Sequence, residues 1–503
     1  MKVLTEEFEK TGQKLIHETT SLCPECLKVL KARVYEENGK IMMSKTCPEH
    51  GDFVDVYWSD AEMYYKAEKW ARSKRSLEVF NTKVEKGCPF DCGLCDAHES
   101  HTALANIVVT NRCNLNCWYC FFYAEKAGYV YEPGLEQIRK MMRSVRSEKP
   151  VACNAVQLTG GEPTMRSDLV DIVRMAKEEG FEHVQLNTNG IKIGEDSELF
   201  KKLVEAGVGV LYLSFDGVSA KTNPKNHKAI PKVLENARKV KKVSVVLVPT
   251  VIGGVNDFEV GDILDFGLQN SDVVRGVNYQ PVSLVGMMPR SERERMRVTI
   301  PDVIKRIEEH TNGAVGRSDF YPIPYTGAFS DFVESLTGNA QYDLNAHFAC
   351  GMGTYVFKDE DKIIPITRFV DVEGLAEFLK ESTGEVKGVG GRFLFTAKLL
   401  YKLRGFIDSS KKPRWLDIYR LLFDALVKHD YSSLGKLHNN SLFIGMMHFM
   451  DLYNYDIERV QKCVIHYATP DDKIVPFCAF NVIPELYRDA GQKKFSVPLN
   501  SKK

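Results

Sequence analysis

An alternation of strand-like and helix-like segments between residues 105 and 286 constrains the fold more than any other feature of this 503-residue chain. Short apolar runs, such as ANIVVTN, NAVQLTG and HVQLNTNG, alternate with longer segments in which apolar residues recur every three or four positions. Such alternation is typical of parallel strands joined by crossover helices. Six strand–helix units predict an α/β fold, a partial (β/α)6 TIM-like barrel whose functional site lies at the carboxyl ends of the strands.

The thirteen cysteines are the second informative feature of the chain. The N-terminus is polar and acidic and has no apolar signal-peptide core, so we expect a cytoplasmic protein. In that compartment, clustered cysteines indicate metal or redox chemistry rather than disulfides. Cys153 stands alone and is expected to be a packing residue. The other twelve form groups of three: Cys23, Cys26 and Cys47; Cys88, Cys92 and Cys95; Cys113, Cys117 and Cys120; and Cys350, Cys463 and Cys478.

The overall charge limits the partners that we expect. Lys and Arg number 67, as do Asp and Glu, so the formal net charge is zero. This balance argues against a nucleic-acid partner. No apolar run is long enough for a membrane-spanning helix.

The motif Cys113-x3-Cys117-x2-Cys120 follows the first strand of the predicted barrel almost directly. Three thiolates suit three irons of a [4Fe–4S] cluster and leave the fourth iron open for a small molecule. The next strand ends in GGEP at 160–163, where glycines allow close backbone approach and carbonyls can accept hydrogen bonds from an ammonium group. The two strands after it end in NTNG and SFDG. Each strand end therefore offers polar groups to the same cavity.

A CxxxCxxC motif with an aromatic residue before its last cysteine, followed by GGEP, resembles the radical S-adenosylmethionine (SAM) superfamily over residues 105–290. The resemblance implies that the cluster binds SAM and donates one electron. SAM then splits into methionine and a 5′-deoxyadenosyl radical, which abstracts hydrogen from an unactivated carbon. A structural zinc site would leave GGEP and the strand alternation unexplained. The SAM-binding residues implied are Tyr119; Gly160, Gly161 and Glu162 for the methionine amino group; Asn187, Ser214 and Asp216 for carboxylate and ribose; and Val251 for adenine.

Two further cysteine groups predict additional clusters. The first, at 88–95, repeats the CxxxCxxC spacing but follows no strand and has Leu94 where an aromatic is expected. We predict an auxiliary [4Fe–4S] site there, with a structural zinc knuckle as the alternative. Its fourth ligand is open among His98, His101, Cys153 and a C-terminal cysteine. The widely spaced group in the C-terminal region predicts another cluster, with buried free thiols as the alternative.

Residues 1–60 predict a small metal-binding ribbon. Cys23-x2-Cys26 and Cys47-x2-His50 lie at the two ends of a strand–turn–strand pattern whose turn is at residues 36–40. Three sulfurs and one nitrogen suit tetrahedral zinc or a single rubredoxin-like iron, and the spacing does not separate the two metals. The alternative is a set of thiols and a histidine without a metal.

The remaining boundaries complete the predicted organisation. Residues 61–104 are a linker with the auxiliary motif, 105–290 the barrel, and 291–503 an α-rich C-terminal extension.

In the extension, residues 387–436 contain eleven Lys or Arg against four Asp, interleaved with aromatic residues. A basic amphipathic segment suits an anionic membrane surface. The alternative is a helix that packs its apolar face on the barrel.

The order of the segments along the whole chain is similar to that of the archaeal tetraether lipid synthases: CPEC…CPEHG comes first, then KGCPFDCGLC, the barrel and a long extension. The resemblance implies C–C coupling of the terminal methyl carbons of isoprenoid chains. The substrates implied are archaeol-type diether phospholipids, and the products are macrocyclic archaeol or tetraether lipids. It also implies work at the inner membrane face and a low-potential electron donor such as ferredoxin.

Two other functions remain open at this point. The alternative enzyme is a radical SAM methyltransferase acting on a pterin precursor of methanopterin, because relatives of this architecture have been associated with that reaction. A non-catalytic electron-transfer or metal-ribbon scaffold is the third possibility, and it would not cleave SAM.

Overall fold

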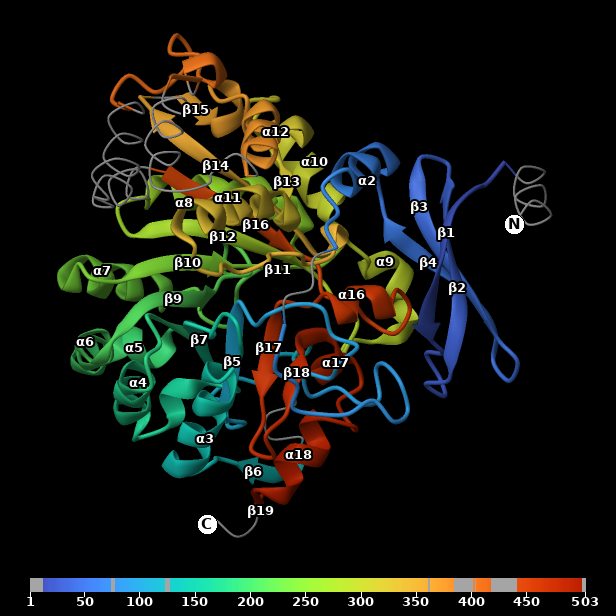
Figure 1. Ribbon diagram of the computed structural model, residues 1–503. Helices are drawn as coiled ribbons and strands as arrows, with labels where there is room; N and C mark the ends of the chain where they lie inside the picture. The colour runs from blue at the N-terminus through green and yellow to red at the C-terminus, as the bar shows by residue number, and fades with distance from the viewer. Residues whose placement is uncertain are drawn as a thin grey trace.

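The structure is a computed structural model, and Figure 1 labels its elements. Most of the basic segment at 387–436, including Lys398, lies outside the residues that it describes. In the part of the chain that is described, no helix is both long enough and apolar enough to cross a membrane. The described residues are 12–73, 77–122, 127–360, 362–383, 401–402, 404–417 and 441–499.

Four antiparallel strands form the N-terminal ribbon, drawn in blue in Figure 1. The turn between the second and third strands contains Asn38 and Gly39, whose φ angles are +51° and +72°. Asn-Gly adopts this left-handed geometry readily, which explains why the predicted turn is found where expected. The strands are β1 (Lys14–Leu22), β2 (Val29–Glu37), β3 (Lys40–Cys47) and β4 (Gly51–Trp58), and helix α2 (Ala61–Glu68) follows them.

The predicted alternation of strands and helices is confirmed by six parallel strands with helices packed outside them (Figure 1). The strand sequences are rich in β-branched residues, as in SVVLV, which favour an extended, buried backbone. The strands are β5 (Leu104–Thr110), β7 (Ala155–Gly160), β8 (His183–Thr188), β9 (Val208–Ser214), β10 (Ser244–Val248) and β12 (Val274–Pro281). The helices are α3 (Leu135–Arg146), α4 (Leu169–Glu178), α5 (Ile191–Glu195), α6 (Ser197–Ala206), α7 (Ile230–Val240) and α8 (Val260–Gln269).

The C-terminal extension adds one parallel strand to each edge of these six strands. Strand β16 (Ser441–Met447) pairs with β12, and β17 (Ile465–Ala468) pairs with β5. Antiparallel strands β14 (Gly351–Asp359) and β18 (Ile474–Pro476) then cover the new edges. Since β16 and β17 do not pair with each other, the described strands form a mixed sheet rather than a closed barrel. The extension contains helices, as predicted, but it also contributes strands to both edges of the sheet.

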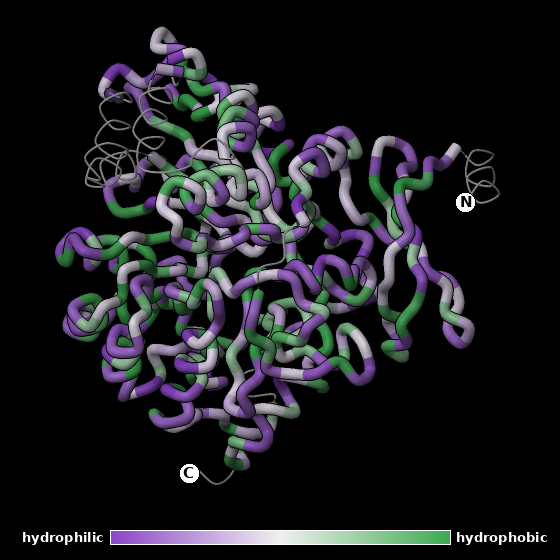
Figure 2. The backbone as a smooth tube through the Cα atoms, viewed as in Figure 1, coloured by the Kyte–Doolittle hydropathy of each residue, from purple (hydrophilic) through white to green (hydrophobic). Residues whose placement is uncertain are grey.

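Most of the hydrophobic core lies between this sheet and its outer helices. Hydrophilic and hydrophobic residues alternate along those helices in Figure 2, as expected for amphipathic helices with one buried face. The helices of the later part of the chain are α9 (Arg293–Met296), α10 (Ile300–His310), α11 (Gly327–Thr337), α12 (Val372–Ser382), α16 (Ile457–Gln461), α17 (Phe477–Val482) and α18 (Arg488–Lys494). The short strands are β6 (Tyr129–Tyr131), β11 (Thr250–Val251), β13 (Tyr321–Pro322), β15 (Lys362–Pro365) and β19 (Ser496–Pro498).

The ribbon packs against the loop between β16 and α16. The Tyr57 hydroxyl, from β4, donates a hydrogen bond of 2.8 Å to Asp456 in this loop. Arg297 lies between the two parts, with its guanidinium 2.8 Å from Asp55 of the ribbon and 2.5 Å from Asp451 of the loop. These three charged side chains are almost completely buried. The ribbon is therefore joined to the C-terminal extension by buried polar contacts.

Candidate active site and metal centres

A cavity of about 1420 Å³, including its open mouth, lies at the carboxyl ends of the parallel strands. This is the place where the fold class predicts a functional site. The predicted residues that line it are Cys113, Cys117, Tyr119 and Cys120 after β5, and Gly160, Gly161, Asn187 and Ser214 at the ends of the next three strands.

The three cysteines of the predicted SAM motif all line this cavity. The backbone N–H of Leu115 donates a hydrogen bond to Cys113 Sγ, at 3.4 Å. Burial raises the pKa of Cys113 to about 12 and also raises the pKa of Cys117, although the nearby Lys225 opposes the second shift. Three sulfur donors without a carboxylate among them fit an iron–sulfur cluster better than a hard metal ion.

Gly160 and Gly161 allow β7 to end close to the loop that follows β5. A Cβ atom on Gly160 would collide with the carbonyl oxygen of Thr110, and one on Gly161 with the carbonyl oxygen of Arg112. Gly160 also has a φ of +145°, which disfavours other residues. The Gly161 N–H donates to the Thr110 carbonyl at 2.9 Å. The two glycines thus fix the cysteine loop against the strand ends.

Glu162 acts behind the cavity wall. Its carboxylate accepts hydrogen bonds from the Thr188 hydroxyl at 2.8 Å and from the Asn189 N–H at 2.7 Å. Burial raises the pKa of this carboxyl group. Glu162 therefore holds the ends of β7 and β8 together and is absent from the described lining of the cavity.

Asp216 and Tyr119 belong to a buried polar network that contains a residue missed from the sequence, Lys225. The Tyr119 hydroxyl donates to Asp216, while Lys225 Nζ donates to the Tyr119 oxygen at 2.6 Å and lies 2.5 Å from the Asp216 carboxylate. Lys225 lines the cavity and supplies a fixed cation beside the cysteine loop, whereas Asp216 and Val251 are buried behind it. Lys225 lies in an irregular loop after β9, and no motif identified it in the sequence.

The C-terminal extension supplies an aromatic wall that the sequence also did not identify. Phe449 and Phe477 stack with ring centroids 3.8 Å apart, and Tyr467 lies 5.4 Å from Phe477. All three line the cavity. The Met- and aromatic-rich stretch at 442–455 is mostly buried, but Met447 and Phe449 also reach the cavity.

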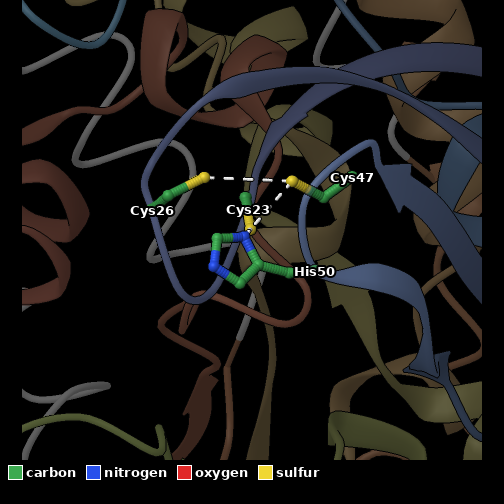
Figure 3. Close-up of side chains that lie close together, drawn as sticks. All are labelled: Cys23, Cys26, Cys47 and His50. Atoms are coloured by element: carbon green, nitrogen blue, oxygen red, sulfur yellow. Dashed lines mark hydrogen bonds between the residues drawn. The ribbon is translucent and has the colours of Figure 1, made fainter.

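The four predicted ligands of the ribbon lie together, as Figure 3 shows. Their ligand atoms are all within 4.8 Å of one another. Cys26 Sγ is 3.8 Å from Cys47 Sγ, and His50 Nδ1 is 3.5 Å from Cys47 Sγ and 3.7 Å from Cys23 Sγ. Three sulfurs and one imidazole nitrogen in this arrangement fit one tetrahedral metal ion.

The predicted auxiliary site borders a separate small cavity. Cys88, Cys92, Cys95 and His98 line it together with residues of the C-terminal extension. The His98 Nε2 atom lies 2.9 Å from the Cys463 carbonyl oxygen and 2.9 Å from His466 Nε2. A histidine that binds a metal through one ring nitrogen usually donates its other N–H to a carbonyl, so these contacts leave His98 among the candidates for the fourth ligand.

Two other candidate fourth ligands of this site are buried. His101 is 2 % exposed. Cys153 lies in the main core, where its thiol donates to the Ala155 carbonyl at 3.2 Å. That contact agrees with the predicted packing role of Cys153.

Cys350, Cys463 and Cys478 lie near one another beside the buried Arg459, although they are far apart in the sequence. Arg459 Nε donates to Cys350 Sγ at 3.4 Å, and Cys463 Sγ donates to the Ile465 carbonyl at 3.1 Å. Burial raises the pKa of Cys463 to about 12 and also raises the pKa of Cys478. A cluster here stays a prediction.

The sequence and the fold are similar to those of several known proteins. The family model "Radical SAM superfamily" matches residues 107–267, and "HMPTM N-terminal zinc ribbon domain" matches residues 15–59. The 7,8-dihydro-6-hydroxymethylpterin dimethyltransferase of Methanocaldococcus jannaschii is 50% identical over 493 residues, which are 96% of each chain. The GTP 3′,8-cyclase of Limosilactobacillus fermentum is 29% identical over 47% of this chain and 73% of its own. A solved methylornithine synthase (PylB) is 16% identical with a TM-score of 0.33, covering 42% of this chain and 64% of that structure.

The nearly full-length similarity to a pterin dimethyltransferase contradicts the predicted coupling of isoprenoid chains and the predicted diether phospholipid partner. A physical reason lies in the cavity, whose interior carries the amide side chains of Asn106 and Gln157. The oxygens of these amides retain unused hydrogen-bonding capacity, which suits a polar ligand better than a hydrocarbon chain. The predicted association with a membrane surface is not shown: it depended on the same lipid assignment and on segment 387–436, most of which lies outside the described residues.

Proposed function

Because the chain belongs to the radical SAM superfamily, and over nearly its full length to the family of the Methanocaldococcus jannaschii pterin dimethyltransferase, we propose that it is a radical SAM methyltransferase. Its proposed substrate is 7,8-dihydro-6-hydroxymethylpterin. The observation that carries this proposal is the extent of the match, which includes the ribbon, the cysteine loops and the C-terminal extension together.

The residues around the main cavity are suited to hold a cofactor and a substrate side by side. When bound by Cys113, Cys117 and Cys120, a [4Fe–4S] cluster supplies the electron that makes SAM a source of a carbon radical. The Gly160 and Gly161 backbone groups, which line the cavity, suit the methionine amino group of SAM. The aromatic wall from the C-terminal extension limits the access of water to the reacting atoms.

Lys225 is the proposed partner of the SAM carboxylate. It is the cation that faces the cavity beside the cysteine loop, and a charge-assisted hydrogen bond to a carboxylate suits it. Asn187 and Ser214 also line the cavity and remain proposed SAM contacts. Asp216 is proposed to position Lys225 and Tyr119 through its contacts with both. Glu162 and Val251 are buried behind the cavity wall and are proposed to support that wall.

The other metal centres are proposed from their donor sets. Zinc is the proposed metal of the ribbon, because the family model that matches residues 15–59 describes a zinc ribbon. Cys88, Cys92 and Cys95 are proposed to hold an auxiliary [4Fe–4S] cluster, which their shared small cavity supports.

The proposal is tested by anaerobic incubation of the reconstituted protein with SAM, a reductant, 7,8-dihydro-6-hydroxymethylpterin and a one-carbon donor that supplies the methyl carbon. Mass spectrometry should detect pterin products that carry one and two added methyl groups, together with 5′-deoxyadenosine. A protein with Cys113, Cys117 and Cys120 replaced by Ala is the control and should form neither product. Formation of deoxyadenosine without any methylated pterin would contradict the proposed substrate.

A further inference from the structure

A row of three amide side chains begins in the interior of the main cavity, where two of its members line the wall. Asn106 of β5 is in register with Gln157 of β7, which is in register with Gln185 of β8. Gln157 Nε2 donates to Asn106 Oδ1 at 2.7 Å, and Gln185 Nε2 donates to Gln157 Oε1. Strands of a parallel sheet that is buried on both faces are normally apolar, so three amides in one register row are a departure from the usual pattern.

The amide row lies deep in the cavity, below the place where SAM is proposed to bind. Asn106 and Gln157 line the cavity and precede the ends of their strands by four and three residues, respectively. At a rise of about 3.3 Å per residue, the row lies about 10 Å below the strand ends. A ligand held by the row would therefore extend toward the cysteine loop.

The row retains capacity to bind a ligand. An amide oxygen has two lone pairs, and the oxygens of Asn106 and Gln157 each accept one hydrogen bond within the row. Each can accept a second hydrogen bond, and the two oxygens come from neighbouring strands. The row therefore offers two adjacent acceptors to a ligand with two adjacent N–H donors.

Tyr212 offers the complementary group from β9. Its oxygen accepts a hydrogen bond from Asn278 Nδ2, and its own hydrogen has no acceptor among the described residues. Burial raises the pKa of Tyr212, which keeps the hydroxyl protonated. Tyr212 lines the same cavity and can donate to a carbonyl oxygen of a ligand.

The remainder of the cavity suits a flat and uncharged ligand. Lys225 is the one cation among the described lining residues, and Asp216 at 2.5 Å and the proposed SAM carboxylate already engage its charge. No free cation in that lining is available to bind a phosphate. The stacked rings of Phe449 and Phe477 supply an apolar wall for a planar ring.

We infer that the amide row and Tyr212 recognise the 2-amino-4-oxo edge of an unphosphorylated pterin. In that edge the 2-amino group and N3–H are adjacent donors and the 4-oxo group is an acceptor, which matches two amide oxygens and one hydroxyl donor. The edge binds at the bottom of the cavity, so the other ring of the pterin, with its 6-hydroxymethyl group, faces the cysteine loop. This inference rests on the proposed pterin substrate and adds the residues that select it.

The test compares the pterin with the analogue in which an oxo group replaces the 2-amino group, 6-hydroxymethyl-7,8-dihydrolumazine. Dissociation constants are measured anaerobically with the reconstituted enzyme. The wild type should bind the pterin at least about tenfold more tightly, since loss of a donor leaves a buried acceptor unpaired. Gln157→Leu should reduce this ratio to near one, whereas Gln269→Leu, at the exposed end of α8, should keep it.

The possible outcomes separate this inference from the proposed function. If the wild type methylates the pterin and Gln157→Leu still discriminates as the wild type does, the role of the amide row is overturned and the proposed function stands. If the wild type forms deoxyadenosine but binds neither pteridine, both fall.

A second variant covers the case in which Gln157→Leu loses its iron and is misfolded. Tyr212→Phe removes one oxygen atom and should weaken pterin binding about tenfold. Unchanged pterin affinity in an iron-replete Tyr212→Phe protein would overturn the recognition of the 4-oxo group.

Discussion

Replacement of Arg297 by Met should loosen the ribbon from the body of the protein. Burial alone would raise the pKa of Asp451, but Arg297 outweighs it and lowers that pKa from 3.8 to about 2. A shift of this size corresponds to about 2 kcal/mol. Because Arg297 also overcomes the cost of burial, its own contribution is larger, and removal of one partner of a buried ion pair costs about 3–5 kcal/mol.

Native-state proteolysis with thermolysin measures this change, because cleavage of a transiently opened segment follows the population of the open form. A loss of about 3 kcal/mol should increase cleavage of the ribbon by about a hundredfold. Arg306→Met is the matched control. Arg306 pairs with Asp257 and is 47% exposed, so its loss should cost less than about 1 kcal/mol. Equal cleavage rates of the two variants would refute the reasoning.

The effect of Arg297→Met should also depend on pH, with a definite sign. Without its cation, the buried Asp451 carboxyl has a raised pKa, so its charged form destabilises the folded variant above that pKa. Protonation removes the penalty as the pH falls. The difference in cleavage rate between Arg297→Met and the wild type should therefore be smaller at pH 5 than at pH 8, and a difference that grows on acidification would contradict this account.

Three further predictions follow from the geometry of single sites. Gly161→Ala should lower the free energy of unfolding by about 1–3 kcal/mol, because the added Cβ collides with backbone. Gly209→Ala is the control, since a Cβ there meets no atom within 4 Å. Similar thermal midpoints for the two variants would argue against the close approach at Gly161. Burial raises the pKa of Glu148 from 4.5 to about 7, so the folded protein loses stability as the pH rises through this interval. Glu148→Gln should raise the thermal midpoint at pH 8 more than at pH 5, and parallel pH curves would contradict this. Cys113→Ala should abolish deoxyadenosine formation. Cys23→Ala should remove one metal equivalent but leave deoxyadenosine formation intact. Cleavage of SAM by Cys113→Ala would exclude the assigned cluster site.

The fold and the position of the main site could be predicted because both leave local signals. Each of the six strands is a short apolar run followed by a helical pattern, and three of them end in polar or glycine-rich segments. Strands β16 and β17 left weaker signals. The run SLFIGMM is short and continuously apolar, so periodicity alone does not distinguish a strand from a buried helix. Pairing of β17 with β5 depends on residues far apart in the sequence, which no local pattern records.

The substrate was harder to predict than the chemistry. Cysteine spacing predicted the ribbon ligands and a SAM-binding cluster because metal ligands need fixed geometry. The same spacing says nothing about the cavity interior, where a few side chains decide which substrate is bound. A usable signal was nevertheless present: the third residue of three successive strands is an amide, at Asn106, Gln157 and Gln185. Lys225 and Phe449 lie in irregular segments and had no comparable pattern.

Strand β5 is complete once residue 110 has been translated, whereas its edge partner β17 begins at residue 465. At about 5–20 residues per second, the ribosome needs roughly 20 to 70 seconds to make the intervening chain. During this interval the apolar β5 has an unpaired edge, which is a template for pairing with other nascent chains. Overproduction of the protein should therefore benefit from slow expression and chaperones, and chains that terminate before residue 465 should be the ones that aggregate.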